Sequence, residues 1–257
     1  MRSNHLLCGA RACWQMRTPC ETFWKHGAAW KALQRRMIDL RLIANDVPFI
    51  LWGVPLTLGI ALSSFALGAF LSVPFAYITL ARVPVVRHVI GAWVQFFTVT
   101  PSLVHITWVY YVVPIAFGLK LSAVEAVILA LGAETSAYLS VILRSGIQAV
   151  PSGQWKAAAV LGLSGWQRAL YVVLPQTVRI VVAPSANMFV LILKETSIAS
   201  ILAVPEILNR GMSVSANTFR PLEVLTTVAL TYFVVAYPFV RMAAALERRS
   251  RIGFRSI

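Results

Sequence analysis

The stretch from Val47 to Ala81 contains no charged residue, and this constrains the fold more than any other feature of the chain. A second apolar stretch, from Val89 to Leu119, contains no Asp, Glu, Lys or Arg and has His105 as its only histidine. About 20 apolar residues are enough for a helix to cross the hydrocarbon core of a bilayer. Each stretch therefore predicts one long or tilted membrane helix.

Three further apolar segments bring the expected number of membrane helices to five. The expected spans lie near residues 47–81, 89–117, 123–143, 178–204 and 223–246. Composition agrees, because the mean hydropathy is +0.74 and only 12% of the residues are charged, which lies outside the range of soluble globular domains. The chain is therefore expected to be an all-α polytopic membrane protein.

Basic residues in the loops indicate which side of the membrane each loop faces. From residue 37 onward, one side holds eleven Lys and Arg residues and the other holds four. The first group is Arg82, Arg87, Arg144, Lys156, Arg168, Arg179, Arg241, Arg248, Arg249, Arg251 and Arg255, and the second is Arg41, Lys120, Arg210 and Arg220. Cytoplasmic loops are enriched in Lys and Arg, so the C-terminus is expected in the cytoplasm. The formal charge of +14 then reflects topology and attraction to lipid headgroups rather than nucleic-acid binding.

Residues 1–36 break this pattern, because they are basic but precede the first span on the expected outer side. They contain all three cysteines together with His5 and His26, at spacings that match no zinc site. One hypothesis is that translation starts at Met37, which leads directly into the first span. The alternative is a basic amphipathic helix that lies on the membrane. Residues 37–257 are expected to form a single transmembrane domain.

The polar loop expected at residues 144–177, between the third and fourth spans, has the pattern of a short docking element. Gly162 permits a tight turn, Ser164 and Gln167 have capping-box spacing, and Pro175 is expected to end the second of two short helices. Small alanines before the turn would let another protein approach closely. An ordinary amphipathic connector is the alternative. The candidate contact residues are Gln154, Trp155, Lys156, Ala157, Ala158, Gly162, Leu163 and Pro175.

This loop resembles the EAA loop of ABC importer permeases, which in that family inserts into a groove on a cytoplasmic ATPase subunit. Further motifs resemble the polar amino-acid permeases of the histidine, glutamine and arginine type, from Met37 to about Arg251. These motifs are Leu51 to Leu58, Trp93 to Val104, Ser136 to Gln148, Leu193 to Ile198 and Pro221 to Arg249. Each motif is weak alone, but together and in this order they are specific.

Several positions depart from the pattern of that family. Gln95, Thr98 and Val99 replace Glu, Arg and Gly before a retained Thr-Pro pair, and Val141 stands where Glu is usual. Lys156 occupies the glutamate position of the EAA loop. Because charge pairs across an interface set specificity, this reversal predicts an acidic or neutral groove on the partner ATPase. The lost acidic positions suggest, as a hypothesis, that the chain pairs with a more typical homologue.

The resemblance implies that the chain forms the translocation pathway of an ATP-driven importer for polar amino acids or their derivatives, in the bacterial inner membrane. The implied partners are a dimer of ATPase subunits, a second permease chain, identical or different, and an extracytoplasmic solute-binding protein. ATP would be bound by the partner, so no cofactor is expected in this chain. An ABC importer for another solute is one alternative. An ion-coupled secondary transporter is another, although the sequence shows no second copy of the loop.

Polar side chains within the spans mark a candidate substrate pathway. Ionisable groups cost roughly 2.5–3.5 kcal/mol at the centre of a membrane helix, so they persist where they pair or line a wet cavity. Glu134, with the hydroxyls of Thr135 and Ser136, is expected to accept the ammonium of a zwitterion. For His105, a structural hydrogen bond to another helix is the favoured interpretation. For Lys194 and Glu195, contacts between helices or with a dimer mate are an open alternative. The full candidate set is Glu134, His105, Thr100, Lys194, Glu195, Thr196 and Ser197.

Sequence patterns typical of an enzyme are absent. None of the five lysines follows a glycine, as the lysine of an ATPase phosphate loop must. The sequence also has neither a Gly-x-Ser-x-Gly elbow nor a His-Glu-x-x-His zinc helix. We therefore expect a transport subunit without catalytic residues, without a bound metal ion and without an ATPase site of its own.

Overall fold

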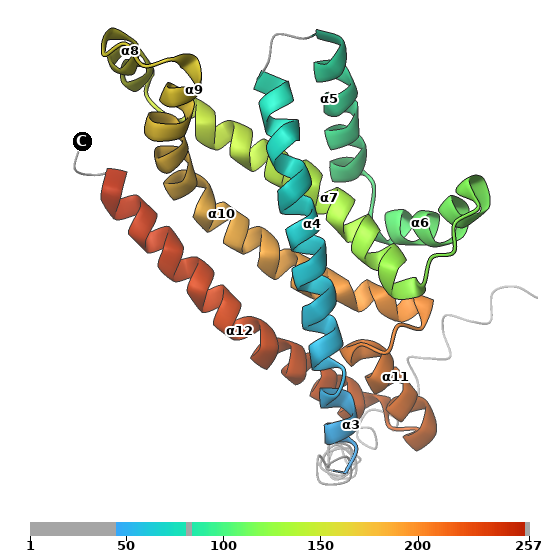
Figure 1. Ribbon diagram of the computed structural model, residues 1–257. Helices are drawn as coiled ribbons and strands as arrows, with labels where there is room; N and C mark the ends of the chain where they lie inside the picture. Colours follow the sequence, from blue (N-terminus) through green and yellow to red (C-terminus); the bar gives the residue numbers. More distant parts are fainter. Residues whose placement is uncertain (1–44, 81–83, 255–257) are drawn as a thin grey trace, which may run out of the picture. The chain divides into compact units, whose positions relative to one another are not determined.

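The computed structural model describes residues 45–80 and 84–254, and every regular element in these two ranges is helical (Figure 1). Residues 46–257 cluster into one compact unit. The expected extension at residues 1–36 and the alternative start at Met37 lie outside the described residues. The all-α fold class expected from the sequence is therefore confirmed for the part of the chain that the structure describes.

Four helical segments within the two described ranges are long and apolar enough to cross a membrane, and a bent helix pair supplies a fifth candidate. The four segments are Val47–Thr79, Ala123–Gln148, Gly165–Leu202 and Pro221–Arg249. They correspond to α3 (Val47–Leu51) with α4 (Val54–Leu80), to α7 (Ala123–Gln148), to the run from α9 to η4, and to α12 (Pro221–Phe254). The expected number of about five spans is thus consistent with the structure.

The second expected span is not one straight helix. It consists of α5 (Pro84–Val99) and α6 (Ser102–Phe117), which are bent by 110° at the break between them. Pro101 has no backbone N–H and disfavours the helical conformation at the preceding residue, so the helix of α5 cannot continue through Thr100. Pro101 itself is extended, with φ −62° and ψ 138°, and serves as the N-cap of α6. The expectation of a continuous helix over 89–117 is therefore wrong.

Two glycines allow α4 and α7 to pack closely along their length. A Cβ atom added to Gly68 would overlap the side chain of Thr135, and one added to Gly132 would lie 2.7 Å from the side chain of Leu67. Small residues at such crossings let helix backbones approach in membranes, where close packing rather than water exclusion holds helices together. The pair α4 and α7 therefore forms the centre of the bundle, as Figure 1 shows.

A buried apolar cluster joins this pair to α10 (Leu174–Glu195). Its members are Ala61 from α4, Leu139 from α7, and Met188, Phe189, Ile192 and Leu193 from α10. The ring of Phe65 meets the ring of Phe189 edge-on, with centroids 5.4 Å apart. This packing fixes the rotation of α10 about its own axis. The directions of Lys194 and Glu195, at the end of α10, are therefore also fixed.

The last turns of α10 lead into a junction with α11 (Ile207–Thr218) and α12. After α10, residues Thr196–Leu202 form the 3-10 helix η4, and Glu206 then caps α11 by accepting a hydrogen bond from the Asn209 N–H at 2.8 Å. The fully buried Glu206 carboxylate also accepts a hydrogen bond from Tyr232 of α12. Burial raises the pKa of Glu206, while these hydrogen bonds oppose the rise. One carboxyl group thus ties α11 to α12.

Candidate functional site

Glu134 of α7 is buried in the bundle, with 3% of its surface exposed. The hydroxyl of Ser102 donates a hydrogen bond to Oε1 of Glu134 at 3.0 Å. The other carboxylate oxygen, Oε2, lies 3.5 Å from Nδ1 of His105. Both partners belong to α6, so the carboxylate of α7 is held against the start of the helix that follows the bend.

The bend is what places these two α6 residues beside Glu134. Because α6 begins at Ser102, Ser102 and His105 are three residues apart on one helix face. The aromatic rings at the end of α5 cover His105 from the other side, with Phe96 and Phe97 centroids 5.4 and 4.6 Å from the imidazole. The start of α6 also provides the positive end of a helix dipole near the carboxylate.

Glu195, the last residue of α10, completes the cluster. Its carboxylate interacts with the hydroxyl of Ser102 and lies near enough to Glu134 for the two charges to repel each other. Within the described residues, Oε2 of Glu195 and Nε2 of His105 are buried without a hydrogen-bond partner, while Oε2 of Glu134 and Nδ1 of His105 have only their contact with each other at 3.5 Å. Buried polar groups in native proteins are nearly always paired. These incompletely paired atoms, gathered in one place, therefore indicate a site for water or a polar ligand.

The chemistry of this cluster favours a cationic group. Two carboxylates present acceptor oxygens that an ammonium can bridge, and a cation between them would relieve their mutual repulsion. The neutral form of His105 would supply one donor and one acceptor in the same space. In the low-dielectric interior, such charge-assisted contacts are stronger than in water.

The structure does not bring every candidate pathway residue into this cluster. Thr100 lies in the bend itself, beside Pro101. Thr135 and Ser136, expected beside the carboxylate, instead bond carbonyl groups of their own helix, at Leu131 and Ala133 respectively. They diverge from Glu134 because successive residues of a helix point in different directions. The expectation that these two hydroxyls join Glu134 in one site is therefore wrong.

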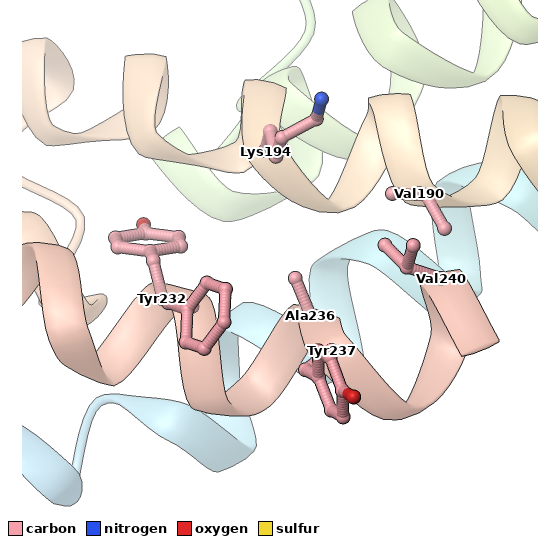
Figure 2. Close-up of a pocket in the computed structure, with 7 residues that line it drawn as sticks. Val190, Lys194, Tyr232, Ala236, Tyr237 and Val240 are labelled. Atoms are coloured by element: carbon pink, nitrogen blue, oxygen red, sulfur yellow. The ribbon is translucent and has the colours of Figure 1, made fainter.

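Lys194 is one of the residues that line a cavity of about 260 Å³ between α10 and α12 (Figure 2). Apart from Lys194, the cavity is lined by Val190, Tyr232, Phe233, Ala236, Tyr237 and Val240. Thr196 and Ser197 donate hydrogen bonds to the carbonyls of Leu193 and Lys194, both at 2.8 Å. These bonds satisfy backbone groups where α10 tightens into η4.

A second feature is the segment that connects α7 to α10. The helix α8 (Ser152–Val160) ends at Gly162, whose φ of +77° reverses the chain. The Gly162 and Leu163 amides donate to the carbonyls of Ala159 and Ala158, which is the Schellman pattern of a helix end. The short α9 (Gly165–Gln167) then begins with the expected capping box of Ser164 and Gln167.

Pro175 does not end a helix, contrary to the sequence-based expectation. The chain runs without interruption from α9 through the π-helical turn η3 (Arg168–Val173) into α10, with Pro175 in the first turn of α10. A wide turn before a proline relieves the steric conflict with the preceding carbonyl groups. Of the expected contact residues, Gln154, Lys156, Ala157, Gly162 and Pro175 are exposed, Trp155 and Leu163 are partly buried, and Ala158 is buried.

Comparison with known proteins places the chain in a family. The model of the family described as "Binding-protein-dependent transport system inner membrane component" matches residues 68–252. The chain belongs to this family. Among similar permeases is the probable glutamine ABC transporter permease GlnP of Bacillus subtilis, 35% identical over 77% of this chain and 93% of the relative. Another is the nopaline transport system permease NocM of Agrobacterium fabrum, 31% identical over 84% of this chain and 96% of the relative.

A solved structure described as an amino acid ABC transporter with histidines has the same fold as this binding-protein-dependent permease. It superimposes with a TM-score of 0.77 at 27% identity, over 82% of this chain and 99% of the other. The bundle built around α4 and α7 is thus a permease fold, and the polar cluster lies inside it.

Sequence reasoning for this permease missed Ser102, which bonds Glu134 and also contacts Glu195. A signal was present, because Ser102 follows a proline and precedes His105 by three residues. A proline that starts a new helix puts residues at that spacing on one face of its first turn. The packing of Phe96 and Phe97 against His105 could not be predicted from the sequence in this way, since it depends on the angle between α5 and α6.

Proposed function

We propose that the chain is the permease subunit of an ATP-driven importer for polar amino acids or their derivatives, and that the cluster around Glu134 binds the substrate. The observation that carries this proposal is the group of buried, incompletely paired polar atoms of Glu134, Glu195 and His105 at the junction of α6, α7 and α10. The family match supplies the transport context. An amino acid suits the site, because its ammonium can bridge the carboxylates of Glu134 and Glu195.

The names of the relatives support this class of substrate. Similar permeases are described with glutamine and nopaline, and the similar solved structure with histidines. All of these are amino acids or amino-acid conjugates that carry a charged nitrogen or an amide. We propose that the site selects for the ammonium common to them, while contacts outside the cluster distinguish their side chains.

The proposed assembly contains four kinds of component. A pair of separate ATPase subunits binds ATP, since this chain carries no phosphate loop. A second permease chain, identical or different, completes the pathway, and an extracytoplasmic binding protein delivers the substrate. The bacterial inner membrane holds the bundle, with the segment from α8 to α9 and the C-terminus in the cytoplasm. Access then alternates between the two sides of the membrane when the ATPases close on ATP.

Uptake into proteoliposomes tests the proposed function. The permease is reconstituted with its ATPase and binding protein, and uptake of radiolabelled amino acids is measured with and without ATP. We expect ATP-dependent uptake that Glu134→Gln lowers about ten- to a hundredfold, because removing one charged partner of a buried ammonium costs roughly 1.5–3 kcal/mol. Substrate-stimulated ATP hydrolysis should fall in parallel.

Glu125→Gln is the matched control for this substitution. Glu125 lies on the same helix but caps its exposed first turn, and Gln serves in a capping box as well as Glu. It should leave uptake unchanged. Uptake that does not need ATP would contradict the importer assignment, and uptake that survives Glu134→Gln would remove Glu134 from the binding site.

A further inference from the structure

The backbone carbonyl of Thr98 lies at the end of α5, where the bend interrupts the helical hydrogen bonds. In a continuous helix this carbonyl would accept a hydrogen bond from the N–H of Ser102, four residues further on. The 110° break between α5 and α6 falls between these two residues and removes this bond. A carbonyl without a partner is costly within a membrane, so the bend needs a donor from another element.

Tyr138 of α7 provides this donor. Its hydroxyl group donates a hydrogen bond to the Thr98 carbonyl at 3.4 Å. The ring of Tyr138 packs against the buried apolar cluster that joins α4, α7 and α10, so the side chain is held along its length. The end of α5 is thus bonded to a side chain whose own position is set by the centre of the bundle.

Tyr138 lies one helical turn beyond Glu134, so both side chains project from the same face of α7. The carboxylate of Glu134 holds the first turn of α6 through Ser102. The hydroxyl of Tyr138 holds the last turn of α5 through Thr98. Tyr138 also interacts electrostatically with Glu134 and Glu195, which places it beside the polar cluster. Adjacent turns of one helix therefore bind the two arms of the bend.

A second hydrogen bond between α5 and α7 lies further from the bend. The indole N–H of Trp93 donates to the hydroxyl of Ser136 at 3.3 Å, and the Trp93 ring lies against Phe97 with centroids 4.4 Å apart. This bond keeps α5 beside α7. Because Trp93 lies more than one turn before Thr98, the direction of the chain at the break depends on the bond to Tyr138.

We propose that Tyr138 is a positioning residue, whose hydroxyl fixes the angle between α5 and α6 and thereby sets the position of Ser102 and His105 in the polar cluster. Tyr138 acts through the Thr98 carbonyl and not by contact with the substrate. The inference rests on the proposed function where it concerns substrate binding, whereas its geometric part concerns this chain alone. The two parts are therefore tested separately.

The distance between the two arms of the bend tests the geometric part. In a chain whose three cysteines are replaced by Ser, spin labels are attached to Gly91→Cys in α5 and Ile115→Cys in α6. A side chain at Gly91 would meet open space and Ile115 is 85% exposed, so both sites accept a label. Labelled chains are diluted with unlabelled chains in nanodiscs, so that double electron–electron resonance reports distances within one chain.

Tyr138→Phe keeps the ring but removes the hydroxyl, and it should widen the distribution of distances between the labels. The reason is that the end of α5 loses its bond to α7 while α6 keeps its own. Tyr111→Phe is the matched control, because it removes a hydroxyl from a tyrosine of α6 that is 59% exposed. It should leave the distribution unchanged.

Substrate binding tests the functional part. The permease is placed in nanodiscs with its ATPase but without the binding protein, and the dissociation constant of radiolabelled glutamine is measured, or of the amino acid that proteoliposomes take up best. Tyr138→Phe should raise it about three- to tenfold, as expected for one lost neutral hydrogen bond. Basal ATP hydrolysis should change less than about twofold, which separates positioning from general damage. In Pro101→Ala, where the bend is already relaxed, the same substitution should have no further effect.

Four results would overturn the positioning role. Native distances in Tyr138→Phe would show that the hydroxyl does not hold the bend. A raised dissociation constant with native distances, or additive losses with Pro101→Ala, would mean that Tyr138 acts on the substrate directly. Widened distances with native affinity would mean that the bend does not set the site. If the native permease neither binds nor imports an amino acid, the proposed function fails, while the distances still decide whether Tyr138 holds the bend.

Discussion

At the scale of single residues, Gly68 shows how tightly the centre of the bundle is packed. A Cβ atom at this position would overlap Thr135 of α7 and would lie 2.9 Å from the carbonyl oxygen of Gly132. The neighbouring atoms belong to a β-branched side chain near its root and to the backbone, and neither moves readily. Gly59, on the same helix, faces open space, with no neighbouring atom within 4 Å of the point that a Cβ would occupy, and provides the comparison.

Alanine substitutions at these two glycines should have opposite effects. Gly68→Ala should destabilise the permease by about 1–3 kcal/mol, because overpacking forces α4 and α7 apart. Gly59→Ala should be neutral or should stabilise by up to about 1 kcal/mol, since Ala favours the helix more than Gly does. Thermal unfolding in detergent, monitored by circular dichroism, measures both. Equal melting temperatures for the two variants would contradict the close helix approach.

At the scale of elements, the bend between α5 and α6 positions the polar cluster. The 110° turn at Pro101 is the reason that Ser102 and His105 reach Glu134 from the first turn of a new helix. If α5 continued through this point, the same residues would lie further along its own axis. The site therefore depends on a backbone break in addition to the side chains that line it.

Removing the proline should disturb the site without unfolding the bundle. Pro101→Ala restores a backbone N–H and allows α5 to extend, which should lower ATP-driven uptake by about tenfold or more, because small displacements of binding groups have large effects. Pro114→Ala removes the proline inside α6, beyond the cluster, and should change uptake less than about twofold. Comparable losses of uptake in both variants would mean that these prolines affect uptake through the stability of the whole bundle and not through the position of the cluster.

The same element shows what sequence reasoning could and could not reach. Uncharged stretches predicted the membrane helices, and an isolated Glu134 in an apolar run predicted a polar site, because both follow from the energetics of burial. The bend angle and the approach of Ser102 to two carboxylates depend on how α6 packs against α7 and α10. Local sequence also favoured a stop at Pro175, whereas the π turn η3 carries the helix through it. The bend angle, the position of Ser102 and the continuation of the helix past Pro175 therefore could not be predicted from the local sequence.

At the scale of the whole molecule, the distribution of basic residues predicts the orientation of the bundle. In Figure 1, α8 and α9 lie at the same end of the bundle as the C-terminal end of α12, and α11 lies at the opposite end. The excess of Lys and Arg belongs to the first end, so this end should face the cytoplasm. Phe219, after α11, is 88% exposed and should then face the outside.

Thiol labelling in intact cells checks this orientation. In a chain whose Cys8, Cys13 and Cys20 are replaced by Ser, a membrane-impermeant reagent should label Phe219→Cys in intact cells. It should label Gly153→Cys, in exposed α8, only after the membrane is made permeable. The reverse pattern would place the segment from α8 to α9 outside and would exclude its contact with a cytoplasmic ATPase.

The unbroken helical run from Gly165 to Glu195 has a mechanical consequence. At 1.5 Å per residue, it covers about 45 Å of helical chain between α9 and Glu195, and it includes the π turn η3 and Pro184. Because every residue in between is helical, tilting the run about one end by only about 5° would displace the other end by several ångströms. A force applied to α9 by a partner protein would thus reach the polar cluster through α10, as movement of Glu195 relative to Glu134.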